Sequence, residues 1–103
     1  MRIIVFITVP GSKEANRIAR GLVEKKLAAC ASIIDGVRSV FRWKGRLDTA
    51  KESLLIVKST RAKFRGLIAF VKSKHSYEVP EIIAFAVTAG NKEYLEWIDA
   101  SVR

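Results

Sequence analysis

The 103-residue chain has one cysteine, Cys30, one histidine, His75, and only two prolines. A lone cysteine excludes an internal disulfide and any Cys-x-x-Cys redox or metal motif, so we expect a reducing compartment, the cytoplasm. The single histidine has no evident Asp or Ser partner, Gly-x-Ser-x-Gly is absent, and the segment 10–13 is too short for a phosphate-binding loop. These absences predict that the protein is not an enzyme.

Acidic residues are scarce: 10 Asp and Glu stand against 19 Lys and Arg, which gives a net charge of +9. A polyanion, an acidic lipid or a small anion is therefore the first partner to consider. The bases are spread along the chain without a run of five or six like charges, and we interpret them as a solvated, mixed surface. The segment 51–59 also lacks the aromatic residues that RNA-recognition strands display, so we expect no specific nucleic-acid partner.

No apolar run is long enough to span a bilayer, so we expect no membrane partner. The longest run, Ile3 to Val9, is rich in β-branched residues and ends at Pro10-Gly11, which predicts a central strand covered on both faces. The length suits one domain, residues 1–103. Half of the residues are apolar, more than so small a monomer readily buries, and this predicts contact between subunits.

The periodicity predicts an α+β fold of order β-α-β-β-α-β followed by a short terminal helix. This order is typical of the ferredoxin-like plan, a four-stranded antiparallel sheet with helices on one face. Ser12, Thr60 and Asn91 are expected to cap the three helices. The expected strands are residues 3–9, 32–43, 54–57 and 81–88.

The second and third strands form a long hairpin, with a turn at Lys44-Gly45. Its outer part carries Phe41 and Trp43, which lie beyond the reach of a small core. We therefore predict that Phe41 and Trp43 make the contact between subunits.

The stretch from His75 to Ile83 gathers a histidine, a tyrosine and two carboxylates ahead of the last strand. Pro80 pushes the residue before it out of the helical region, so the second helix ends here and Glu78 and Glu81 lie near the start of the strand. Any chemistry of the chain is expected at this point.

Several segments in order together resemble the divalent-cation tolerance CutA family. They are Ala28-Ala29-Cys30, Gly36-Val37-Arg38-Ser39, Trp43-Lys44-Gly45, residues 54–58, residues 75–83, Gly90-Asn91, Tyr94-Leu95 and Trp97-Ile98. The resemblance implies a ferredoxin-like homotrimer joined through its strands, similar in plan to the nitrogen-regulatory PII proteins and linked to copper and other divalent ions. Ser76 stands where the family usually has proline, and Arg42 where many members have tryptophan.

Two binding hypotheses follow. In the first, copper or another divalent ion binds through Cys30 with His75 and Glu78, at the start of the last strand or across a subunit boundary, and folding does not require the metal. In the second, a small anion binds in clefts between subunits, near Tyr77, Glu81 and Lys58. Cys30 as a buried apolar residue and His75 bonded to backbone are the structural alternatives.

Overall fold

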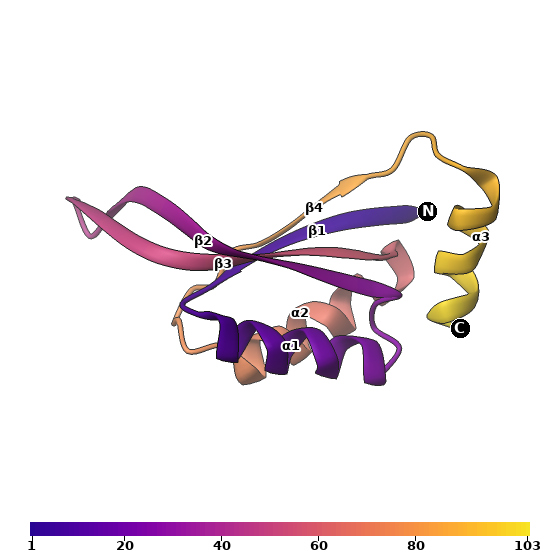
Figure 1. The fold of residues 1–103 in the computed structure, drawn as a ribbon, viewed down its shortest axis with the longest axis horizontal. Helices are drawn as coiled ribbons and strands as arrows, with labels where there is room; N and C mark the ends of the chain where they lie inside the picture. The colour runs from indigo at the N-terminus through magenta and orange to yellow at the C-terminus, as the bar shows by residue number, and fades with distance from the viewer.

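The computed structural model describes residues 1–103 and has the expected order of elements. The strands are β1 (Arg2–Val9), β2 (Cys30–Trp43), β3 (Arg46–Thr60) and β4 (Ile82–Ala86); the helices are α1 (Ser12–Glu24), α2 (Phe64–Lys74) and α3 (Lys92–Ser101), with a 3-10 turn η1 (Arg61–Lys63). The sheet is antiparallel in the order β2-β3-β1-β4, with α1 and α2 on one face (Figure 1). The ferredoxin-like prediction is confirmed.

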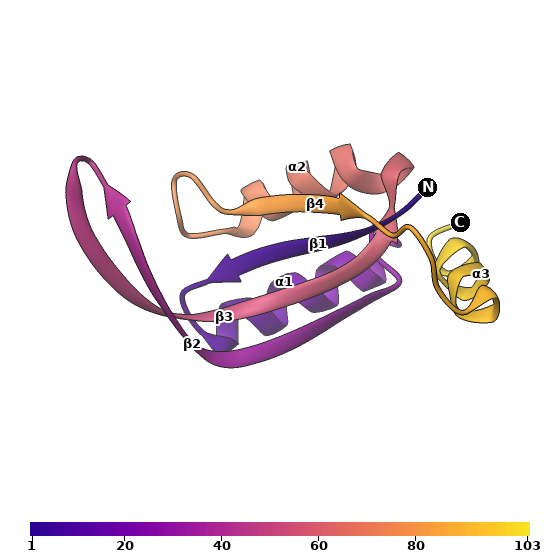
Figure 2. The same ribbon diagram turned by 90° about the horizontal axis from the view of Figure 1, so that it is seen from above.

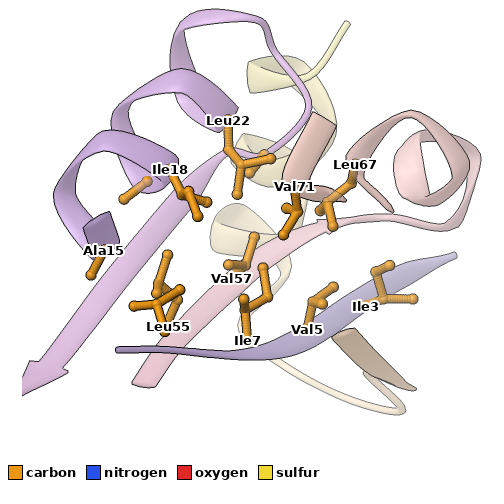
Figure 3. Close-up of a cluster of buried hydrophobic side chains, with 13 residues drawn as sticks. Ile3, Val5, Ile7, Ala15, Ile18, Leu22, Leu55, Val57, Leu67 and Val71 are labelled. Carbon is orange, nitrogen blue, oxygen red and sulfur yellow. The ribbon is translucent and has the colours of Figure 1, made fainter. Parts of the chain in front are cut away.

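Strand alternation places the core between the sheet and the two helices. In β1 the odd-numbered residues from Ile3 to Val9 are buried and the even-numbered ones are only partly covered. The buried side chains of β1 and β3 meet those of α1 and α2 in one cluster (Figure 3). Its labelled members are Ile3, Val5, Ile7, Ala15, Ile18, Leu22, Leu55, Val57, Leu67 and Val71.

Several predicted boundaries were wrong in detail: β2 begins at Cys30 rather than at residue 32, and β4 covers Ile82–Ala86 rather than residues 81–88. Ser12 is the first residue of α1 and the N-cap is Gly11, while Thr60 precedes η1 and makes no capping bond. The third strand is 15 residues long, because its first half pairs with β2 in the hairpin outside the core and therefore needs no apolar alternation. Asn91 does cap α3, since its Oδ1 accepts a hydrogen bond from the Glu93 N–H.

The β2–β3 hairpin projects from the body, which gives the molecule a length of 44 Å against 25 and 23 Å in the other directions (Figure 2). Lys44 and Gly45 both have positive φ, as a two-residue turn that follows the twist of the strands requires. At the base of the hairpin the pairing shifts between Ile34 and Val37, where Gly36 has a φ of 75°. The shift bends the hairpin away from the four-stranded part.

The face of the sheet opposite α1 and α2 is apolar but has no layer over it. We call this the open face. Phe6 and Phe85 meet on it edge to face, with ring centroids 5.1 Å apart. The pairing of the strands places the following residues on it: Ile4, Phe6, Ile34, Leu54, Ile56, Ile83 and Phe85. About half of the surface of Ile34, Ile83 and Phe85 is exposed.

Helix α3 packs at the end of the sheet remote from the hairpin (Figures 1 and 2). Ile98 and Val102 are buried there against Ala29. Arg2 holds the same helix through two hydrogen bonds to Asp99, at 3.0 and 2.6 Å. This guanidinium lowers the pKa of Asp99 from its usual value. None of the helices is both long and apolar enough to cross a membrane.

Leu55 and Leu47 in β3 offer a matched test of where the core lies. Leu55 is fully buried, whereas Leu47 in the hairpin is 74% exposed. Leu55→Ala should lower the free energy of unfolding by about 2–5 kcal/mol through lost burial and a cavity. Leu47→Ala should change it by less than about 1 kcal/mol. Denaturant unfolding measures both, and equal losses would contradict this placement of the core.

Candidate functional site

His75 lies immediately after α2, and its side chain is buried with both ring nitrogens in use. Nδ1 accepts a hydrogen bond from the Tyr77 N–H at 3.0 Å, so in the neutral ring Nε2 carries the proton and donates it to the Thr8 carbonyl at 2.7 Å. This arrangement joins the loop after α2 to the end of β1. His75 therefore matches the alternative of a histidine bonded to backbone.

Ser76 ties the same loop to α1. Its N–H and its hydroxyl both donate to Glu14 Oε2, at 2.9 and 3.2 Å. That carboxylate oxygen also lies 3.5 Å from His75 Nδ1. A proline at position 76 would have neither this N–H nor the hydroxyl, so both contacts depend on Ser76.

Tyr77 and Glu52 form the centre of a polar cluster at the base of the hairpin. Glu52 is only 7% exposed and accepts from the Tyr77 hydroxyl at 2.9 Å and from the Ser39 hydroxyl at 2.5 Å. Burial, followed by the hydrogen bond to this carboxylate, raises the pKa of Tyr77 to about 12. This hairpin-base cluster of Ser39, Glu52 and Tyr77 links β2, β3 and the loop after α2.

A polar hollow of about 280 Å³ lies beside this cluster. Segments 10–12 and 51–53 line it together with Asp35 and Gly36, and it has no large apolar side chain. Ser53 donates to Asp35 at 2.7 Å within it. Asp35 and Glu52 are the acidic residues of its lining, and Lys51 is the one basic residue.

Cys30 lies elsewhere, at the first position of β2 and opposite Lys58. Its Sγ is 3.8 Å from Lys58 Nζ, and the same ammonium group donates to Ser32 at 3.2 Å. The pairing of Cys30 and Ile4 with Lys58 places the side chains of Cys30 and Lys58 on the open face, at the end away from the hairpin. Cys30 is partly covered and has no disulfide partner.

One chain does not bring the predicted metal ligands together. Cys30 lies level with Ile4 of β1, because both pair with Lys58 of β3, whereas the His75 ring contacts Thr8 of β1. Ile4 and Thr8 are four residues apart, which is about 13 Å along a strand. Glu78 is exposed on the loop. No group of three Cys, His, Asp or Glu side chains is arranged to hold a metal ion. The residues of a single chain therefore do not fit a complete metal site.

The other predicted site residues are also dispersed. Tyr77 lies in the hairpin-base cluster, whereas Lys58 is at the far end of the open face beside Cys30. Glu81 lies near the end of β1, where the Thr8 hydroxyl donates to it at 3.5 Å. Phe41 and Trp43 are 38% and 44% exposed on the hairpin.

Three acidic residues of the polar surroundings of His75 and Tyr77 were not predicted from the sequence: Glu52, Glu14 and Asp35. Glu52 lies in a part of β3 without apolar alternation, so no local pattern marks it, and its partners Ser39 and Tyr77 lie 13 and 25 residues away. Glu14 and Asp35 likewise have no local signal, because their partners lie 62 and 18 residues away in the chain.

The raised pKa of Tyr77 predicts a loss of stability in alkali. Because the folded chain keeps the Tyr77 proton up to about pH 12, while an unfolded tyrosine loses it near pH 10, this contribution is complete below pH 10 and decreases as the pH rises towards 12. Ultraviolet titration of phenolate should show Tyr77 ionising last, and Tyr77→Phe should remove that step.

Tyr94→Phe is the matched control for this titration, because it deletes the phenol of α3 and should leave the late step in place. If the late step survives in Tyr77→Phe and disappears in Tyr94→Phe, the account of the hairpin-base cluster is wrong.

Comparison with known proteins gives one family. The family model described as CutA1 divalent ion tolerance protein matches residues 3–101. Protein CutA 1, chloroplastic, of Oryza sativa is 42% identical over 101 residues, and the divalent-cation tolerance protein CutA of Thermus thermophilus is 46% identical over 98 residues. These alignments cover 98% and 95% of this chain.

The relatives differ in length. The chain spans 57% of the rice protein and 56% of its counterpart from Arabidopsis thaliana, but 95% of the Thermus protein. A solved structure from Archaeoglobus fulgidus, described as a periplasmic divalent cation tolerance protein CutA, has a TM-score of 0.97 at 44% identity and covers all of both chains. The chain belongs to the CutA1 divalent ion tolerance protein family.

Proposed function

We propose that the protein is a homotrimeric divalent-metal-ion tolerance or response protein, which binds copper or another divalent ion and does not catalyse a reaction. The family names of its relatives support the metal as the ligand. The open face supports assembly. Chloroplastic and periplasmic relatives are known, so the cytoplasm stays a prediction for this chain.

The observation that carries the proposal is the composition of β1. Its apolar run supplies both faces of the sheet, but one chain covers only the odd-numbered side. Ile4 and Phe6 point to the open face, where they continue into Ile83 and Phe85 of β4. Contiguous apolar surface of this kind on a small protein marks a contact with another molecule. Three copies around an axis can cover their open faces with one another.

Assembly would also stabilise the hairpin. The hairpin extends from the body as a two-stranded ribbon in which Phe41 and Trp43 are partly exposed. An isolated ribbon of this kind has little stability in water. A neighbouring copy that packs along the ribbon would cover its aromatic residues and its free edge.

Copper is the proposed cargo, because a thiolate selects Cu(I) over harder ions. Cys30 is the one thiol of each chain and lies on the open face, where residues of other copies would meet it in a trimer. The further ligands, His75 and Glu78 in the proposal, must come from neighbouring chains, and His75 must first give up a backbone hydrogen bond. We therefore expect weak binding that folding does not require.

The alternative is a small anionic ligand held between subunits, as in the PII proteins. The polar hollow gives it less support than the metal, because two carboxylates and one lysine favour a cation over an anion. Lys58 and Tyr77 could share such a cleft only if they came from different chains.

Phe85→Glu tests the open face and Val79→Glu is its control. Both residues are exposed and apolar in one chain, at 49% and 65%, but Val79 lies in the loop outside this face. Light scattering should give three times 11.5 kDa for the native protein and for Val79→Glu, and a smaller mass for Phe85→Glu, since assembly would bury the new charge.

Trp43→Ala tests the hairpin in the same experiment. Removal of a buried aromatic anchor costs on the order of 2–4 kcal/mol, so the trimer should dissociate at a higher protein concentration than the native one. A native protein that is monomeric at micromolar concentration would refute the assembly.

Competition titration with Cu(I) tests the metal separately. Cys30→Ser should weaken binding about tenfold or more, because it removes the soft ligand. His75→Ala and Glu78→Gln should have smaller effects, and Ser32→Ala, next to the thiol, should have none. If Cys30→Ser binds as well as the native protein while the trimer persists, the copper proposal fails and Cys30 is a packing residue.

A further inference from the structure

The charge of the chain is concentrated on one layer of the fold. We call residues 12–26 and 61–74 the helical layer; they contain α1, η1 and α2. This layer has two carboxylates, Glu14 and Glu24, and a net charge of +8 out of the chain's +9. Its ten cations are Lys13, Arg17, Arg20, Lys25, Lys26, Arg61, Lys63, Arg65, Lys72 and Lys74. The expectation of a mixed surface is therefore wrong for this side.

These cations have no carboxylate partners. The ion pair of the structure, Arg2 with Asp99, includes no cation of the helical layer. Glu14 is already bonded to Ser76. All ten cations except the half-buried Lys63 are exposed. The layer thus presents uncompensated positive charge to the solvent.

The helix period aligns the cations. Lys13, Arg17 and Arg20 follow one another at intervals of four and three residues, so they lie along one face of α1. Arg65 and Lys72 are seven residues apart and likewise share a face of α2. Lys25 joins the two helices, since its ammonium group lies 6.0 Å from the centre of the Phe70 ring.

The helical layer lies on the side of the sheet opposite the open face (Figures 1 and 2). Assembly through the open face leaves it uncovered, and a trimer would present it three times. The inference does not depend on assembly, because one chain already carries the complete layer.

The side chains of the layer distinguish among the polyanions. Single-stranded nucleic acid is bound by stacking on aromatic rings, but the exposed aromatic residues all lie on other elements: Phe41, Trp43, Phe85, Tyr94 and Trp97. An interfacial membrane helix needs an apolar face, and Val23 is the one large apolar residue exposed on the layer. Rigid helices with Arg and Lys side chains suit the regular phosphates of a duplex.

We propose that the helical layer binds the sugar-phosphate backbone of double-stranded nucleic acid without reading its sequence. The guanidinium groups of Arg17, Arg20 and Arg65 donate to phosphate oxygens, and the lysines add charge around them. Because the contacts are to phosphates, binding is general and strongly dependent on salt.

Fluorescence anisotropy with labelled duplexes of about 20 base pairs tests this, with two unrelated DNA sequences and one RNA duplex as arms. The native protein should bind both DNA sequences equally, with a slope of log K against log salt of about −3 or steeper. The RNA arm shows whether the backbone geometry matters, and binding to either kind of duplex supports the proposal.

Two matched double variants separate the layer from net charge. Arg17→Glu with Arg65→Glu should weaken binding about tenfold or more at about 50 mM salt and flatten the slope. Lys92→Glu with Arg103→Glu makes the same change of charge outside the layer and should weaken it about twofold at most. Circular dichroism and light scattering confirm that both variants keep the native fold and mass.

Three outcomes overturn the proposal. They are equal losses in the two double variants, a slope shallower than about −1, and retention on phosphatidylserine vesicles by a native protein that binds no duplex. The last result would assign the layer to an anionic lipid surface.

Discussion

The fold depends on a sheet with two apolar faces in a chain that has helices for only one of them. Alternation along β1 and β3 directs one set of side chains into the core under α1 and α2 and directs the other set, which is also apolar, to the open face. Burial of apolar surface is the main favourable term in folding and association. One chain completes the first burial and leaves the second face exposed, and the proposed assembly would cover that face.

The two sides of the sheet therefore differ in their surface chemistry. The open face carries the aromatic pair Phe6 and Phe85 and, at one end, Cys30 with Lys58. The opposite side, the helical layer, carries a net charge of +8 out of the chain's +9. At the base of the hairpin, Glu52 and Tyr77 connect the ribbon to the loop that His75 holds in place. Movement of the hairpin would therefore be transmitted to this loop through the Glu52–Tyr77 hydrogen bond.

Much of the fold could be predicted because local patterns determine it. The apolar run of β1, the end of α2 before His75, the Asn91 cap and the Lys44-Gly45 turn all follow from the residues themselves. The strand was predicted to be covered on both faces, and the structure shows one face covered within the chain. The length of β3 could not be predicted, because its outer half pairs with β2 without a core to impose alternation.

The site was harder to predict, since it depends on contacts between distant segments. Cys30 and His75 were expected to lie together. No local pattern determines the order of the strands in the sheet, and the observed order places the two residues at opposite ends of β1. Glu14 and Glu52 became visible only through their bonds to the loop after α2. The charge of the helical layer was present in the sequence but divided between two segments.

Native mass spectrometry of the purified protein tests the central claim most directly, because it counts chains and retains bound ligands. If copies cover one another's open faces, the spectrum should show one main species of three chains, at three times 11.5 kDa, and addition of copper should raise its mass without changing the number of chains. A main species of one chain at micromolar concentration would contradict the claim, since the open face would then be stable in water by itself.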